Sequence, residues 1–237
     1  MEKTRVFPRL GVLGGMGPLA TADFLFQLVS ETVATCDQEH IPLLIWADPS
    51  IPDRSEAILH QGSSPLPYLK KGITFLQKSG ASAIVIPCNT AHHWYDDLQA
   101  MSSVPILHIA GSVIDVLKSR VPEGSSVSIL ASSGCLRSGF YQERLSRAGY
   151  IPHMTDESVQ MDVDELIYLI KSGRLFQVER LQRKLTSKLP EGAKHNTLLG
   201  CTELSAAFRR ELPTSGLIDS SNALALSCVR WWREQVG

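Results

Sequence analysis

The sequence predicts an α/β fold of two similar lobes, each a three-layer structure on a parallel sheet, related by pseudo-twofold symmetry. Short apolar strands alternate with helical stretches along the chain, as βαβ units require. The same order of elements occurs twice, as an internal repeat of about 100 residues. Each copy ends in a strand followed by a cysteine. The spacing agrees, with 75 residues from Leu13 to Cys88 and 71 from Leu130 to Cys201.

The first half of the chain contains each element of one lobe. A strand at Leu10–Leu13 runs into the glycine-rich turn Gly14–Pro18, whose proline suits the first turn of a following helix. The residues then predict a helix over Ala20–Thr32, a strand at Pro42–Ala47, a helix over Leu66–Ser79, a buried strand at Ala83–Pro87 and a helix over Trp94–Met101.

The second half repeats this order. A strand at Val127–Leu130 leads into the small-residue turn Ala131–Gly134, which matches the glycine-rich turn of the first half. The following elements are a helix over Ser138–Ala148, a strand at Tyr150–His153, helices over Val163–Lys171 and Leu175–Leu189, a strand at Asn196–Leu199 and a helix over Ser205–Glu211.

The repeat divides the chain into two lobes. We expect residues 1–108 together with 213–237 to form the N-terminal lobe, and residues 109–212 the C-terminal lobe. Ligands of open parallel sheets bind outside the carboxyl ends of the strands. Cys88 and Cys201 both lie just past such ends, so the symmetry predicts that they face each other across an interlobe cleft.

The composition is that of an ordinary globular protein. Hydrophobic residues make up 43% of the 237 residues, charged residues 20%, and the net charge is −1. Lysine and arginine are scattered, which excludes the basic patch of a nucleic-acid-binding protein. No apolar run is long enough to span a membrane and no targeting segment is recognisable, so we expect a cytoplasmic protein. The five cysteines are widely spaced and odd in number, unlike a disulfide framework.

The residues around the two cysteines suit an anionic ligand. Each cysteine is expected to precede a helix, where backbone N–H groups and the helix dipole lower the pKa of a thiol and bind a carboxylate. Asn89, Thr90 and Thr202 add side-chain donors. The alternative for these three is simple helix capping, for which Asn and Thr are favoured.

Two opposed cysteines suit the inversion of a stereocentre. One thiolate removes the α-proton from one face, and one thiol delivers a proton to the other face. Preorganised N–H and hydroxyl donors at the two helix starts would stabilise the developing enediolate. The pair therefore indicates a two-base proton transfer without a metal or an organic cofactor.

At this point the sequence resembles the aspartate/glutamate racemase family, the cofactor-independent amino-acid racemases, over nearly the whole chain. The resemblance rests on five motifs: GVLGGMGPLAT at Gly11–Thr21, IPDRS at Ile51–Ser55, PCNTAH at Pro87–His92, SGFY at Ser138–Tyr141 and GCTEL at Gly200–Leu204. The two cysteine motifs occurring together, in this order and at this spacing, are specific. The resemblance implies an isomerase acting on aspartate or glutamate without pyridoxal phosphate (PLP), and a homodimer.

The resemblance also implies roles for particular residues. The catalytic cysteines correspond to Cys88 and Cys201, and both being cysteine implies that D and L forms are processed. The residues that bind the substrate are expected to be Met16 in the turn that closes over it, Asn89, Thr90, Thr202 and Ser132 at the α-carboxylate, and Arg54 at the acidic side chain. Lys171 is expected to correspond to a basic substrate-binding residue on the second-lobe helix. Cys135 is expected near the site without taking part.

Arg54 also has a reading independent of the family. It lies in a Pro- and Ser-rich loop after a strand, where an arginine makes a bidentate contact to a carboxylate. The alternative is an exposed or loop-bracing arginine.

Other functions remain as alternatives. Gly15-Met16-Gly17 fits part of a dinucleotide-binding fingerprint and would suit a nucleotide-binding oxidoreductase, although the acidic residue expected about 20 positions later is missing. Cys88 with His92 and His93 would suit a Cys–His hydrolase or a metal site, although no third metal ligand stands out. A third alternative is a non-catalytic amino-acid-binding protein, which loss of one cysteine would have favoured, but both cysteines are present.

The substrate stays open at this stage. Hydantoin racemases, glutamate racemases and maleate or arylmalonate enzymes share the two-lobed plan, and Arg54 favours the aspartate/glutamate branch. The sequence does not separate aspartate from glutamate or from a broader amino-acid specificity, because one methylene changes binding by only about 1–3 kcal/mol.

Overall fold

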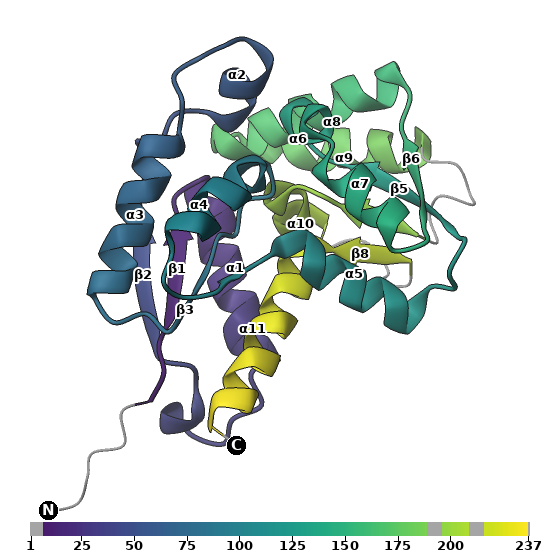
Figure 1. The fold of residues 1–237 in the computed structure, drawn as a ribbon. Coiled ribbons are helices and arrows are strands. Elements are labelled where there is room, and N and C mark those ends of the chain that lie inside the picture. Colours follow the sequence, from purple (N-terminus) through teal and green to yellow (C-terminus); the bar gives the residue numbers. More distant parts are fainter. Residues whose placement is uncertain (1–6, 189–195, 209–215, 237) are drawn as a thin grey trace, which may run out of the picture.

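The computed structural model describes residues 7–188, 196–208 and 216–236 of the chain. Two four-stranded sheets form its framework, with strand orders β2-β1-β3-β4 and β6-β5-β7-β8. Every pairing between neighbouring strands is parallel. The two orders are the same arrangement used twice, which confirms the predicted pair of α/β lobes (Figure 1).

The first lobe surrounds the sheet that contains the first cysteine strand. Its elements are β1 (Leu10–Gly14), α1 (Pro18–Glu31), the short 3-10 helix η1 (Asp37–Glu39), β2 (Leu43–Ala47), α2 (Arg54–Leu59), α3 (Leu66–Lys78), β3 (Ala83–Val85), the 3-10 helix η2 (Thr90–Trp94), α4 (Tyr95–Met101) and β4 (Ile106–Leu107). Most bounds agree with the sequence-based elements within two residues.

The second lobe follows the same order. Its elements are α5 (Ile109–Arg120), β5 (Ser126–Leu130), α6 (Ser133–Ser138), α7 (Phe140–Arg147), β6 (Ile151–Met154), α8 (Glu157–Lys171), α9 (Leu175–Lys188), β7 (Thr197–Leu199), α10 (Thr202–Phe208) and β8 (Leu217–Asp219), before the chain ends in α11 (Ser220–Val236). The predicted ends of two helices, at Leu189 and at Glu211, lie outside the described residues.

Several sequence-based assignments differ from the structure. The helices expected from Val163 and from Ser205 begin earlier, as α8 at Glu157 and α10 at Thr202. The helix expected over Ser138–Ala148 is divided at Gly139, whose φ of +74° is left-handed and ends α6 before α7 begins. The range 213–237 was assigned to the N-terminal lobe, but β8 within it pairs with β7 in the second sheet. The chain therefore returns to the first lobe only with α11, because the apolar strand β8 completes the edge of the second sheet.

Apolar side chains cover both faces of each sheet, which gives each lobe its three layers. In the first lobe, α1 and α11 pack on one face around Phe24 and Leu224, and α3 packs on the other around Ile73. In the second lobe, α8, α9 and α10 cover one face and α5 and α7 the other. Within the described residues, no helix is both long and apolar enough to cross a membrane.

Helices of one lobe also pack against the other, which fixes the place where the lobes meet. α2 contacts α6 so closely that a Cβ added at Gly134 would lie 2.6 Å from the Cα of Ser55. Figure 1 shows α2 at the top of the molecule, near α6 of the second lobe. A glycine is needed here because backbone of the first lobe occupies the space of a side chain.

The Gly134 contact leads to a stability prediction. Gly134→Ala should lower the free energy of unfolding by about 1–3 kcal/mol, because backbone atoms must move to admit the methyl group. Gly111→Ala in α5 is the matched control, since its added Cβ has only an ordinary contact at 3.7 Å. Chemical denaturation of both variants checks this. Equal stability of the two variants would contradict the close packing of α2 on α6.

Candidate functional site

The two cysteine turns meet where the lobes face each other. Cys88 follows β3 and Cys201 follows β7, and each side chain is only 5–6% exposed. The hydroxyl of Thr202, next to Cys201, donates a hydrogen bond of 3.3 Å to the carbonyl of Pro87, next to Cys88. Residues more than a hundred positions apart are thus joined directly beside the two thiols.

The polar residues after Cys88 contact the second lobe and the start of α11. Asn89 donates through Nδ2 to the hydroxyl of Ser220 at 3.0 Å and accepts through Oδ1 from the hydroxyl of Tyr141. The hydroxyl of Thr90 lies 3.1 Å from that of Ser132. Asn89 makes no side-chain capping bond to η2. Simple capping therefore does not account for Asn89 or Thr90.

Ser132 caps a helix. Its hydroxyl accepts from the backbone N–H of Cys135 at the start of α6 and lies 3.5 Å from the hydroxyl of Ser55. Together with Thr90, these contacts gather three hydroxyl groups from both lobes at one point. Ser55 was not predicted from the sequence, although it belongs to the IPDRS motif.

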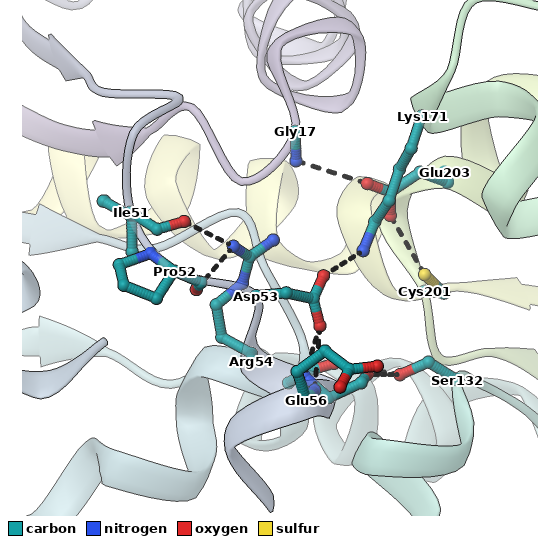
Figure 2. Close-up of polar contacts among 12 residues, drawn as sticks. Gly17, Ile51, Pro52, Asp53, Arg54, Glu56, Ser132, Lys171, Cys201 and Glu203 are labelled. Atoms are coloured by element: carbon teal, nitrogen blue, oxygen red, sulfur yellow. Dashed lines mark hydrogen bonds and ion pairs between the residues drawn. The ribbon is translucent and has the colours of Figure 1, made fainter. Parts of the chain in front are cut away.

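Arg54 is buried rather than exposed, with 7% of its surface accessible. Its Nη1 donates to the carbonyls of Ile51 and Pro52 at 3.2 and 3.1 Å, so the loop-bracing alternative is correct for this nitrogen. Its Nε is buried and has no hydrogen-bond partner among the described residues. Figure 2 shows the guanidinium directed toward the space beside Lys171 and Glu203. Part of a buried cation is therefore left available for an anion.

Lys171, at the end of α8, reaches the same place from the second lobe. Its Nζ forms an ion pair of 3.3 Å with Asp53, which precedes Arg54 and caps α2 (Figure 2). Burial lowers the pKa of Lys171, but Glu203, Cys201 and Asp53 together raise it above its usual value. For Asp53, burial raises the pKa, but Lys171 and a backbone N–H outweigh it, and the net pKa is lowered.

The pKa of the Cys201 thiol is raised, whereas the sequence predicted that it would be lowered. The thiol donates a hydrogen bond of 3.0 Å to Oε2 of Glu203, the second residue of α10. Burial, followed by the charge of the Glu203 carboxylate, raises the pKa of Cys201 well above its usual value. The expected lowering by the helix start is thus overcome, because burial and a neighbouring carboxylate both favour the neutral thiol.

Cys88 precedes η2, a 3-10 helix, while α4 begins only at Tyr95. An α-helix N-terminus therefore follows Cys201 directly but does not follow Cys88. The first-lobe thiol lies in an irregular turn instead.

The glycine-rich turn after β1 closes against the second lobe. Met16 is 2% exposed and packs in the apolar cluster that contains Cys88. The N–H of Gly17 donates to Oε1 of Glu203 at 3.2 Å, and the N–H of Gly15 donates to Thr21. A dinucleotide pyrophosphate would require these two N–H groups as donors. Both already donate to side chains of the protein, Glu203 and Thr21. The turn therefore does not support the oxidoreductase alternative.

His92 does not contact the thiol of Cys88. Its Nδ1 bonds the backbone carbonyl of Cys88 at 2.9 Å, and its Nε2 accepts from the N–H of Ile109 at 3.2 Å. His92 is therefore neutral and holds the turn by its main chain, and it does not serve the proposed Cys–His pair. No group of three or more His, Cys, Asp or Glu side chains that could hold a metal occurs in the described ranges.

The buried His92 predicts a pH dependence of stability. Burial lowers its pKa to about 4, whereas an unfolded histidine titrates near 6.5. The stability contributed by neutral His92 is complete above pH 6.5 and is lost as the pH falls toward 4. By pH 5 the loss should reach about 2 kcal/mol.

Denaturation between pH 7.5 and 5 measures this loss. His92→Asn should reduce the dependence without removing it, because burial also lowers the pKa of the neighbouring His108. His93→Asn, at an exposed position, should leave it unchanged. An unchanged slope in His92→Asn would contradict the assignment.

The other cysteines have distinct surroundings. The thiol of Cys135 donates to the carbonyl of Gly200 at 3.7 Å, so it lies beside the site, and burial raises its pKa. Cys228 is fully buried in the core of the first lobe. Cys36 is exposed, in the loop before η1. All five cysteines are free.

The site as a whole combines groups from both lobes. Two buried thiols follow equivalent strands, hydroxyl and amide groups lie beside the first, and a carboxylate lies beside the second. Arg54 and Lys171 provide cationic groups on one side. Such an arrangement can bind an anionic molecule and move protons to and from it.

Comparison with known proteins agrees with this class of site. The model of the Asp/Glu/Hydantoin racemase family matches residues 13–228. The chain therefore belongs to the Asp/Glu/Hydantoin racemase family, and it is an isomerase of the racemase type.

Individual relatives match over most of their length. The chain is 28% identical to a broad specificity amino-acid racemase, RacX, of Bacillus subtilis, over 93% of this chain and 96% of the relative. The structure of Picrophilus torridus aspartate racemase has a TM-score of 0.82 and 28% identity, covering 95% of this chain and 94% of that one. Glutamate racemase from Francisella tularensis, at 16% identity and a TM-score of 0.65 over 96% of this chain and 81% of its own, shares the fold.

Proposed function

We propose that this protein is a PLP-independent racemase that inverts the α-carbon of aspartate or glutamate by a two-base transfer between Cys88 and Cys201. The observation that carries the proposal is the pair of buried thiols on equivalent turns of the two lobes, joined by the Thr202–Pro87 hydrogen bond. The two turns come from opposite lobes, so a substrate held between them would offer one face to each thiol.

The α-carboxylate of the substrate is proposed to bind at the polar residues beside the thiols. Asn89, Thr90, Ser132 and Thr202 are all buried and supply amide and hydroxyl groups. The Thr90–Ser132 bond, the bonds of Asn89 to Ser220 and Tyr141, and the bond of Thr202 to Pro87 would be exchanged for bonds to the carboxylate. Fixed donors at that position also stabilise the enediolate that forms when the α-proton leaves.

The side-chain carboxylate is proposed to bind Arg54 and Lys171. The unpartnered, buried Nε of Arg54 supports this, because a buried N–H without an acceptor is costly and an anion would satisfy it. Lys171 would exchange Asp53 for the substrate carboxylate. Met16 and the turn around it would close the site from the side of β1.

A racemisation assay tests the proposed function. Purified, reduced protein without added pyridoxal phosphate should convert L-aspartate or L-glutamate to the racemic mixture, as measured by chiral chromatography. A panel of neutral and basic amino acids distinguishes an enzyme specific for acidic amino acids from one of broader specificity. The name of the Bacillus subtilis relative, a broad specificity amino-acid racemase, favours the second possibility. Absence of inversion over the whole panel would refute the proposal.

The protein is further proposed to form a homodimer and to act in the cytoplasm. A homodimer is supported by exposed apolar side chains on the outer face of α1 and at the start of α9, at Phe26, Val29 and Phe176. Light scattering after gel filtration would test it, and a monomer at micromolar concentration would refute it. The five free cysteines fit a reducing compartment such as the cytoplasm.

A further inference from the structure

Asp53 places a carboxylate of the protein itself beside the two cations of the site. It forms the 3.3 Å ion pair with Nζ of Lys171, and Figure 2 shows it between that ammonium and the guanidinium of Arg54. Burial raises the pKa of Asp53, but the charges of Lys171 and Arg54 and the N–H of Glu56 outweigh this effect, so its net pKa is lowered. The cations that are proposed to bind the substrate's side chain therefore already share an ionised carboxylate.

The first turn of α2 fixes the position of this carboxylate. Oδ1 of Asp53 accepts hydrogen bonds from the N–H groups of Ser55 at 2.7 Å and Glu56 at 3.0 Å, while Oδ2 faces Lys171. Asp53 cannot turn away from the site without losing both bonds. Lys171 has a long and flexible side chain, so the lysine is the partner that can move when an anion arrives.

The charges around this ion pair are balanced. Arg54 and Lys171 carry two positive charges and Asp53 and Glu203 two negative ones, so the net charge of the four groups is 2 − 2 = 0. A substrate with an uncharged side chain would leave Lys171 paired with Asp53. A substrate with an acidic side chain would have to displace Asp53 from Lys171, and its carboxylate would then lie close to the charge of Asp53, which repels it.

We propose that Asp53 is a specificity-determining residue, which competes with the side-chain carboxylate of the substrate for Lys171 and so lets the site accept uncharged side chains as well. This proposal rests on the proposed racemase function. Asp53 acts through Lys171 and through its charge, without a bond to the substrate. With an acidic substrate, Lys171 exchanges the carboxylate of Asp53 for that of the substrate. With a neutral substrate, the ion pair between Asp53 and Lys171 stays closed.

Asp53→Asn removes the charge and keeps the helix cap. The side-chain oxygen of asparagine can accept the same N–H bonds, and asparagine caps helices as well as aspartate does. Its amide nitrogen is a donor and cannot bind the ammonium of Lys171, so Lys171 becomes free for an anion. Asp156→Asn is the matched control, because Asp156 is exposed and caps the opposite end of α8 through the N–H of Val159 at 2.9 Å.

Calorimetry with succinate and butyrate tests the proposal without turnover. Succinate has a second carboxylate that butyrate lacks, so the ratio of their Kd values measures the contribution of the side-chain subsite. In Asp53→Asn this ratio should shift toward succinate by about tenfold or more, whereas Asp156→Asn should keep the wild-type ratio. In the racemisation assay, kcat/KM for aspartate relative to asparagine should rise by a similar factor. The rise should come mainly from KM, because the carboxylate is bound alike in the ground state and the transition state.

The two acids also separate this role from a structural one. A merely structural Asp53 would weaken the binding of both acids alike, so an unchanged or smaller preference for succinate in Asp53→Asn would overturn the proposal. Absence of succinate binding in both proteins would also overturn it. If Asp53→Asn does not fold, Asp53→Ser replaces it, since serine is a favoured neutral cap. Stronger succinate binding in a protein that racemises no amino acid would refute the proposed function and leave the role of Asp53 in place.

Discussion

Replacing either Cys88 or Cys201 by alanine is expected to reduce amino-acid inversion by about 10²–10⁴-fold, the usual contribution of a positioned acid or base. Each variant leaves one face of the α-carbon without a group that can move a proton. The remaining thiol still serves its own face. Each variant should therefore exchange the α-proton of one enantiomer only, and the two variants should select opposite enantiomers. Chiral chromatography with mass spectrometry in D₂O measures both effects.

Cys36→Ser is the control for these variants, because Cys36 is exposed in the loop before η1 and far from the site in sequence and fold. It should retain wild-type inversion. Full two-way racemisation by Cys201→Ala would contradict the two-base account, since a single thiol would then serve both faces. Exchange of the same enantiomer by both variants would contradict the opposed placement of the thiols.

The second large effect is expected at Arg54. Arg54→Gln should lower kcat/KM for aspartate and glutamate by about 10²-fold or more, because a buried charge-assisted contact to the side-chain carboxylate is lost. Neutral amino acids should lose much less, since they make no such contact. A comparison of kcat/KM between an acidic and a neutral substrate measures the selectivity directly.

Arg54 also braces its own loop through the carbonyls of Ile51 and Pro52. Some loss of stability is therefore expected, and it would lower activity on all substrates alike. The ratio between acidic and neutral substrates removes this common effect. Arg147→Gln, at an exposed ion pair with Glu143, is the matched control. An equal loss for acidic and neutral substrates would refute the assigned role of Arg54.

The fold was predictable because its signals are local and occur twice. Alternating apolar strands and helices, the small-residue turns and the matched spacing to Cys88 and Cys201 defined both sheets. The edge strands β4 and β8 contain two and three residues, too few for a periodic pattern. For this reason the sequence did not reveal that β8 belongs to the second sheet.

The site was predictable only in part, because sequence motifs name residues but not their partners. Cys88, Cys201, Asn89, Thr90 and Thr202 could be found, since they follow strands in recognisable motifs. Bonds between distant parts of the chain could not be predicted, because Tyr141 and Ser220 meet Asn89 only after folding. Glu203 was visible in the GCTEL motif, but its carboxylate could not be placed beside the thiol of Cys201 without the turn of α10.

The most direct test of the account is the fate of the α-hydrogen at low conversion in D₂O. Purified, reduced protein is incubated with L-aspartate or L-glutamate. The enantiomers are then separated, and the deuterium content of each is measured by mass spectrometry. The account predicts that the D enantiomer carries deuterium at Cα while the remaining L substrate still carries hydrogen. Equal deuterium in both enantiomers would contradict the two-base transfer, and no inversion with no deuterium uptake would contradict the racemase itself.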